Sequence, residues 1–156
     1  MITADVLNAI DTSVLYWLAT VSSEGEPNVS PKEAFVYNNG RILIAHIASP
    51  KSIANLRSNP KVCLSFVNVF TQRGYKVNGI ARVIDKSNSE YNQLQAPLSE
   101  MVGEDHKILA IISIEPSNVE RVTAPSYNIH PEITPEEMIS QSLKTYKVDE
   151  YARRTE

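Results

Sequence analysis

The sequence contains one cysteine, Cys63, and no long hydrophobic run. A single cysteine excludes an intramolecular disulfide, and a lone thiol in a strand-like segment is typical of a small core residue in a reducing compartment. No segment reaches the uninterrupted apolar length that crosses a bilayer, so we expect no membrane partner. Residues 1–12 lack the basic start and apolar block of a signal peptide, which predicts a cytoplasmic protein.

Positive charge is also scarce, with 15 Lys and Arg against 18 Asp and Glu and a formal net charge of -3. Nucleic-acid-binding domains usually carry a basic excess, so we expect no nucleic-acid partner. His46, His106 and His130 have no short spacing that suits a metal, and we predict no metal site. P-loop, Gly-x-Ser-x-Gly and dinucleotide-binding glycine patterns are missing too, and the sequence identifies no catalytic side chain.

The sequence consists mainly of short strand patterns separated by turn signals. A chain of 156 residues fits one domain. Pro31 interrupts one strand pattern, as is typical of an edge or a bulge, and 38-NNG-40 predicts a hairpin turn. We therefore predict a mainly β fold with helices, a six-stranded antiparallel barrel, closed or nearly closed, over about residues 1–122. The six expected strands are 14–22, 28–37, 41–48, 61–70, 75–85 and 107–116.

Helices are expected at 3–11, 50–58 and 87–103, and after Thr134 in a C-terminal arm and helix spanning about 123–156. Thr3 and Ser87 are the expected caps of the first and third, and Pro97 is expected to kink or end the third. The last begins with a cap, a proline and two acids in 134-TPEE-137. The pair Asn78-Gly79 predicts either a bulge or a close strand approach in its strand.

The segment 49-SPKS-52 directly follows a strand pattern and opens a helix. Proline suits the first helical position, and the following N–H groups carry the positive end of the helix dipole. Lys51 adds a full charge, and Ser49 and Ser52 add hydroxyl donors. This turn is a candidate phosphate site, although the same four residues are also a common helix start that binds only water.

The order of these motifs resembles the FMN-binding split barrels related to pyridoxamine 5'-phosphate oxidase. The matching pieces are 17-WLATVSSEGEPNVSPK-32, 41-RILIAHIASPKSIANLRSNPKV-62 and 73-RGYKVNGIARV-83, and 117-SNVERVTAPSYN-128 resembles the ending of short members. The resemblance implies a six-stranded split β-barrel that forms a homodimer with FMN at the subunit interface. It also implies an FMN-dependent oxidoreductase acting on a small-molecule substrate through the flavin N5 atom.

The resemblance implies the following cofactor-binding residues. Lys51 and Ser52, with Ser49 at the turn, would hold the FMN phosphate. Residues Ser30, Pro31 and Lys32 match the strand beside the flavin ring, and Ala45 and His46 match the strand that flanks it. Gln72, Arg73 and Lys76 lie where family members place basic or amide groups. A buried structural role for His46, and solvated loop charges at Arg73 and Lys76, are the alternatives.

The sequence also departs from pyridoxamine 5'-phosphate oxidases. Gly74 stands where a glutamine is expected, and 146–156, including Arg153 and Arg154, lacks the basic substrate motif, so the substrate is not predicted. Two other functions stay open: electron transfer or flavin storage without a substrate, and a split barrel that binds deazaflavin or haem. Tyr127 is expected either over the partner's flavin groove or on its own barrel. The side chains expected to form either the dimer interface or the barrel core are Ile42, Ile44, Val67 and Val69.

Overall fold

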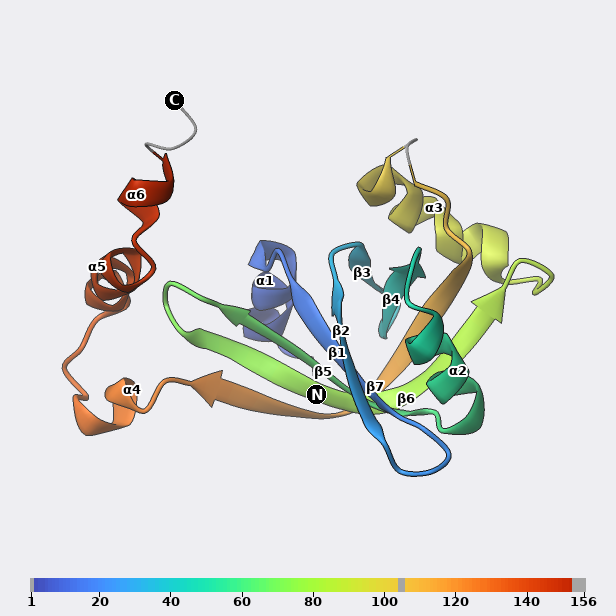
Figure 1. Ribbon diagram of the computed structural model, residues 1–156, viewed down its shortest axis with the longest axis horizontal. Helices are drawn as coiled ribbons and strands as arrows, with labels where there is room; N and C mark the ends of the chain where they lie inside the picture. Colours follow the sequence, from blue (N-terminus) through green and yellow to red (C-terminus); the bar gives the residue numbers. More distant parts are fainter. Residues whose placement is uncertain (1, 104–105, 153–156) are drawn as a thin grey trace.

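The computed structural model describes residues 2–103 and 106–152. Its centre is a strongly curved antiparallel sheet of seven strands in the order β2-β1-β5-β6-β7-β4-β3 (Figure 1). Within the described ranges, no helix is long and apolar enough to cross a membrane. The strands are β1 Tyr16–Val21, β2 Pro27–Lys32, β3 Phe35–Asn38, β4 Arg41–His46, β5 Lys61–Asn68, β6 Arg73–Asp85 and β7 Ala110–Thr123.

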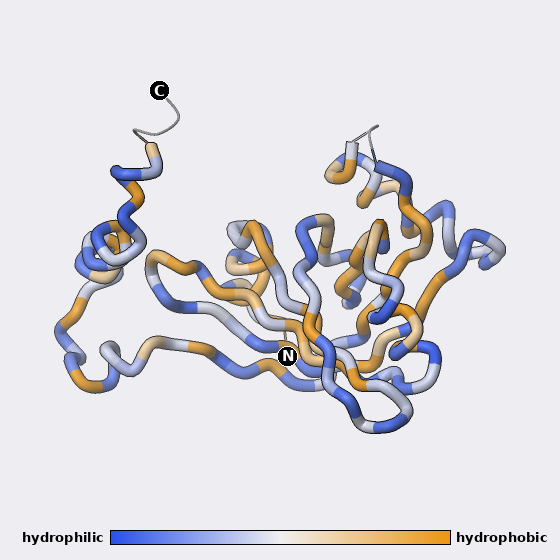
Figure 2. Tube along the Cα trace, in the orientation of Figure 1, coloured by the Kyte–Doolittle hydropathy of each residue, from blue (hydrophilic) through white to orange (hydrophobic). Residues whose placement is uncertain are grey.

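The helices lie at the two ends of the sheet, except for α1, which packs on the core between them. Helices α2 and α3 lie at one end of the molecule, and the C-terminal helices form an arm at the other end (Figure 1). Figure 2 shows hydrophobic residues along the central strands and hydrophilic residues in the turns after β1 and β6. The helices are α1 Ala4–Thr12, α2 Pro50–Ser58, α3 Tyr91–Val102, α4 Ser126–Ile129, α5 Pro135–Thr145 and α6 Val148–Ala152.

The expected strand 28–37 is two strands, which is why the sheet has seven strands and not six. Its first half, β2, pairs with β1, and its second half, β3, pairs with β4. The chain bends at Glu33 and Ala34, and the N–H of Ala45 donates to the carbonyl of Ala34. The two edges of the sheet are therefore consecutive segments of one bent chain, and no β2–β3 ladder closes the barrel. Pro31, which has no N–H, lies on the edge strand β2, as predicted.

Local turn signals are confirmed, whereas some boundaries differ. Asn39 and Gly40 have φ of 48° and 83°, the left-handed values that the hairpin turn requires. The register of β6 against β7 shifts between Asn78 and Gly79, as predicted. The prediction that Ser87 caps α3 was wrong, because Glu90 occupies the N-cap position. Pro97 lies inside α3 and does not end it.

The strand β4 is buried on both faces and separates two hydrophobic clusters. Ile42 and Ile44 are fully buried with Tyr16, Leu18 and Phe66, beneath α1, so they belong to the barrel core and not to an exposed interface. Leu43, on the opposite face, packs with the residues that hold α3, including Tyr91 and Leu98. Since α3 is fixed against β4, its C-terminal end lies beside the start of α2.

The C-terminal arm packs on the β5–β6 hairpin of its own chain. The Tyr127 hydroxyl donates to the Thr71 carbonyl (2.7 Å), and the Ser142 hydroxyl donates to the Phe70 carbonyl (2.9 Å). Thr134 and Glu137 form the reciprocal cap that begins α5, as the 134–137 motif predicts. Tyr127 thus lies on its own barrel in this chain. Arg153 and Arg154 lie outside the described residues.

Gly74 has a packing reason that explains its departure from the family pattern. It pairs with Val67 of β5, and a Cβ added to it would overlap the Phe66 carbonyl oxygen and lie 2.7 Å from the Val67 Cα. Both obstructing groups are backbone, so they cannot rotate aside. A glutamine would meet the same obstruction in this backbone.

We therefore expect Gly74→Ala to lower the free energy of unfolding by about 1–3 kcal/mol, the usual range for overpacked sites. Chemical denaturation monitored by circular dichroism measures this change. Ser65→Ala, on the same strand pair, is the control and should change stability by less than about 0.5 kcal/mol. An unchanged unfolding midpoint for Gly74→Ala would contradict the close approach of β5 and β6.

Candidate functional site

A groove of about 690 Å³ lies between β2, the turn from β4 into α2, and the C-terminal end of α3. This volume is within the usual range for small-molecule sites. Seven of the predicted site residues line it together, although they come from two segments of the chain. These seven are Ser30, Pro31, Lys32, Ala45, Ser49, Lys51 and Ser52.

Lys32 is the buried cation of the groove. Its side chain is 5% exposed, and its ammonium donates to Ser30 Oγ (2.8 Å), Ser49 Oγ (2.6 Å) and the Pro31 carbonyl (3.1 Å). All three acceptors are neutral. Across residues 2–103 and 106–152, no carboxylate lies within ion-pair distance of this ammonium. Burial therefore lowers the pKa of Lys32 below its usual value.

The start of α2 is exposed to the groove without a side-chain cap. Ser49 occupies the N-cap position, and Pro50 occupies the first helical position as predicted. The Ser49 hydroxyl accepts from Lys32 and makes no capping hydrogen bond. The first-turn N–H groups of Lys51 and Ser52 lack intrahelical partners by the geometry of an α-helix. This turn therefore presents polar N–H groups and the positive end of the helix dipole to the groove.

Polar side chains behind the turn fix its position. Ser52 is 1% exposed, and its Oγ lies 2.8 Å from Ser30 Oγ. Asn28 Nδ2 donates to both Ser52 Oγ (3.4 Å) and Thr20 Oγ1 (3.3 Å), and Asn55 Nδ2 donates to Thr20 Oγ1 (3.0 Å). These contacts tie β1, β2 and α2 together and fix the positions of the two serines.

His46 supports the turn and does not line the groove. Its Nδ1 accepts a hydrogen bond from the Ser49 N–H (3.3 Å), and its ring is buried. Burial, and secondarily the charge of Lys32, lower the pKa of His46 below its usual value. A neutral imidazole with an unprotonated Nδ1 is the form that accepts this bond. These contacts fit the structural role that the sequence left open for His46.

Besides His46, three predicted residues lie outside the groove of their own chain. Gln72 Nε2 donates to Ser142 Oγ (3.3 Å), and the Arg73 guanidinium stacks on the Tyr127 ring at 3.8 Å. Lys76 forms an ion pair with Glu120 (2.8 Å), and this partner raises the pKa of Lys76. All three therefore have partners on their own chain.

Sequence reasoning missed part of the groove wall. Asn28 and Glu33 are on the strand that was predicted, but the other wall comes from Met101, Val102 and His106. Residues 87–103 were predicted only as a helix. No local signal indicates that its C-terminal end reaches the α2 turn, because that contact depends on how α3 packs against β4.

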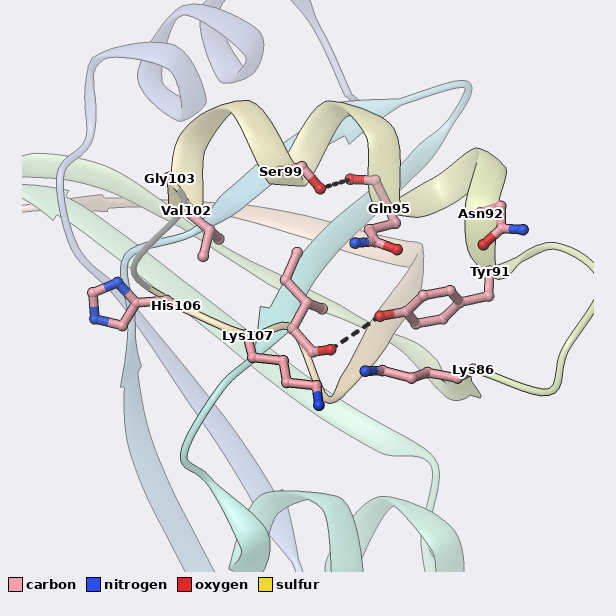
Figure 3. Close-up of a pocket in the computed structure, with 10 residues that line it drawn as sticks. Lys86, Tyr91, Asn92, Gln95, Ser99, Val102, Gly103, His106 and Lys107 are labelled. Atoms are coloured by element: carbon pink, nitrogen blue, oxygen red, sulfur yellow. Dashed lines mark hydrogen bonds between the residues drawn. The ribbon is translucent and has the colours of Figure 1, made fainter.

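A second cavity of about 740 Å³ adjoins the groove and shares Val102 and His106 with it. Figure 3 shows the Gln95 side chain extending from α3 into the cavity, and Lys86 and Lys107 extending into it from opposite sides of the view. The Tyr91 hydroxyl donates a hydrogen bond to the Ile108 carbonyl (3.0 Å) and so joins two sides of the cavity lining (Figure 3). A small molecule in this cavity would lie next to whatever fills the groove.

No cluster of His, Cys, Asp and Glu that could hold a metal ion occurs in the part of the chain that the structure describes. The half-buried Cys63 lies on β5, and burial is the main cause that raises the pKa of its thiol. Cys63 does not line the groove.

Solved structures share this fold at low sequence identity. HupZ of Group A Streptococcus is 21% identical, with a TM-score of 0.66 and coverage of 80% of this chain and 99% of HupZ. HutZ, the haem storage protein of Vibrio cholerae, is 19% identical, with a TM-score of 0.64 and coverage of 76% and 92%. An FMN-binding protein of Syntrophomonas wolfei subsp. wolfei is 15% identical, with a TM-score of 0.63 and coverage of 77% and 88%.

No curated protein sequence matches the chain. The model of one protein family, described as pyridoxamine 5'-phosphate oxidase, matches residues 2–137, which is most of the chain. The order of motifs found in the sequence and the split barrel found in the structure agree with this match. The chain therefore belongs to the pyridoxamine 5'-phosphate oxidase family.

Proposed function

We propose that the protein binds FMN, with the phosphate at the start of α2, and acts as an FMN-dependent oxidoreductase. The observation that carries this proposal is the buried ammonium of Lys32, which has only neutral partners among the described residues. A buried cation without a counter-ion is unfavourable, and a phosphate in the groove would supply the missing negative charge. Lys51 and the uncapped N–H groups would bind the same phosphate.

The rest of the groove suits the remainder of the cofactor. Apolar contacts come from β2, β4 and the residues that follow them, and from α3. These residues are Pro31, Ala34, Ala45, Ile47, Met101 and Val102. Bound FMN would supply hydride or electron transfer, which no side chain of the groove provides. The role of this chain is then to bind the phosphate and hold the ring between the strands and α3.

We also propose that the active form is a homodimer. The outward face of β1 and β2 carries Trp17 and Val29, which are 45% and 59% exposed. A second copy on this face would bury them and wall the groove, and Gln72, Arg73 and Lys76 stay proposed cofactor contacts in that assembly. Sedimentation velocity tests this, since a species of one chain mass, 17.4 kDa, would contradict it.

The second cavity is the proposed space for a small-molecule substrate, because it shares Val102 and His106 with the groove. A protein that binds flavin but serves electron transfer or storage would leave this space unused. Reduction of the bound flavin by a nicotinamide donor, followed by transfer to an added acceptor, distinguishes the two. Haem or deazaflavin in the groove is the other alternative, and each has absorption bands that differ from those of FMN.

Lys51→Ala is expected to weaken FMN binding by about tenfold or more, because a hydrogen bond to a charged group contributes about 1.5–3 kcal/mol. Quenching of flavin fluorescence during titration measures this affinity. Lys61→Ala, which removes an exposed lysine of β5 outside the groove, is the matched control. If both variants bind FMN as tightly as the wild type, the start of α2 is not the phosphate site.

A further inference from the structure

The ammonium of Lys32 has no proton left for a ligand. An ammonium carries three N–H donors, and here they reach three acceptors: Ser30 Oγ, Ser49 Oγ and the Pro31 carbonyl. The distances of 2.6–3.1 Å are those of well-formed hydrogen bonds. A phosphate in the groove would therefore meet the serines that surround the charge, and not the charge itself.

Ser49 is turned into a donor by this arrangement. Because its Oγ accepts from Lys32, its own hydroxyl proton must point to another acceptor. Among the residues that the structure describes, no side chain or carbonyl accepts that proton. The Ser49 N–H is already bound to His46, and Ser49 lines the groove. Its hydroxyl is therefore available to a ligand as a donor.

The pair of Ser30 and Ser52 offers one more donor by the same reasoning. The two hydroxyls carry two protons, and one of them forms the bond between the oxygens, 2.8 Å apart. Ser30 Oγ also accepts from Lys32, and Ser52 Oγ also accepts from Asn28. Whichever serine donates within the pair, the other serine keeps one proton that has no acceptor among the described residues.

We propose, on the basis of the FMN function above, that Lys32 is a positioning residue that acts on the cofactor phosphate through the Ser49 hydroxyl and the free hydroxyl of the Ser30–Ser52 pair. The ammonium occupies one lone pair of Ser49 and one of Ser30, which leaves the Ser49 proton and one proton of the Ser30–Ser52 pair for a ligand. Together with the uncapped N–H groups of α2, these hydroxyls give the start of α2 a set of hydrogen-bond donors. Such a set suits a ligand that only accepts hydrogen bonds, as a phosphate ester dianion does, and disfavours an alcohol in the same place.

The experiment compares FMN with riboflavin, which has the same ring and ribityl chain but ends in a hydroxyl. We expect Ser49→Ala to raise the dissociation constant for FMN by about tenfold or more and to leave that for riboflavin within about threefold of the wild type. Ser49→Thr keeps the hydroxyl and should restore FMN affinity to within about threefold of the wild type. A variant that merely distorts the groove would weaken both ligands equally.

Two results overturn the inference. If Ser49→Ala binds FMN within about threefold of the wild type, the ammonium freed from Ser49 contacts the phosphate directly and the hydroxyl is dispensable. If Ser49→Ala weakens FMN and riboflavin equally, Ser49 has only a structural role. Both results leave the proposed function intact, whereas failure of the wild type to bind FMN overturns the proposed function and this inference together.

Discussion

Replacing Lys32 with methionine is expected to weaken FMN binding by about 100-fold, while the flavin-free protein becomes more stable. Methionine fills similar space without a charge. Without the ammonium, the phosphate lacks its counter-charge and the hydroxyls of Ser30 and Ser49 are no longer oriented by Lys32. Both losses weaken FMN binding. The same change removes a buried cation whose partners are neutral, which accounts for the stability.

The stability gain should depend on pH in a defined direction. Burial lowers the pKa of Lys32 in the folded chain below its ordinary value of 10.5. The folded state therefore disfavours the protonated lysine, and this destabilisation is fully present below the folded pKa. It disappears as the pH rises from the folded pKa to 10.5, where the lysine loses its proton in the unfolded chain as well.

Thermal unfolding of the flavin-free proteins measures this effect. Lys32→Met should melt about 2–4 °C above the wild type at neutral pH for each 1 kcal/mol gained, and the difference should shrink as the pH approaches 10.5. Lys51→Met, at an exposed position, should show no such gain. A lower melting temperature for Lys32→Met at neutral pH would mean that the ammonium is well compensated in the free protein.

The second large effect is expected for Tyr16→Ala, which should lower the free energy of unfolding by about 3–5 kcal/mol. Tyr16 is fully buried, and its ring stacks on Phe35 and Phe66 with centroid distances of 3.4 and 4.5 Å. Its hydroxyl donates to the Ile10 carbonyl (3.1 Å) and so joins α1 to the sheet. Burial raises the pKa of this phenol, so it stays a neutral donor.

Urea denaturation of Tyr16→Ala and Tyr16→Phe separates the two contributions. Tyr16→Phe keeps the ring and removes one hydrogen bond, so a loss of about 1 kcal/mol is expected. A domain of this kind is stable by about 5–15 kcal/mol, and Tyr16→Ala therefore removes a large share of the total. A loss below about 1 kcal/mol for Tyr16→Ala would contradict the packing of the ring between β1, β3 and β5.

Features that depend on neighbouring residues were predictable from the sequence. Pro50 marks the start of α2, Asn39 and Gly40 adopt the expected hairpin turn, and the shift at Asn78 and Gly79 is where the pair indicated it. Pro31 correctly indicated an edge, although the split of its strand into β2 and β3 was not predicted. That split depends on which strand each half pairs with, and pairing is a long-range property.

The arrangement of the site was only partly predictable for the same reason. The sequence places a lysine at 32 and a serine at 49, but only the fold brings them to 2.6 Å and buries the charge. The wall of α3 depends on contacts with β4, and neither Met101 nor His106 carries a local signal for it. Gln72 and Arg73 were chosen by family position, and their partners here lie on the C-terminal arm.

The most direct test of the proposed phosphate site is a titration of the purified wild-type protein with FMN and, separately, with riboflavin, followed by absorption and flavin fluorescence. The buried ammonium and the uncapped start of α2 predict that FMN binds at least about 100-fold more tightly than riboflavin, because only FMN carries the phosphate. Equal affinity for the two flavins, or no binding of either, would contradict a phosphate site built from Lys32, Ser49, Lys51 and Ser52.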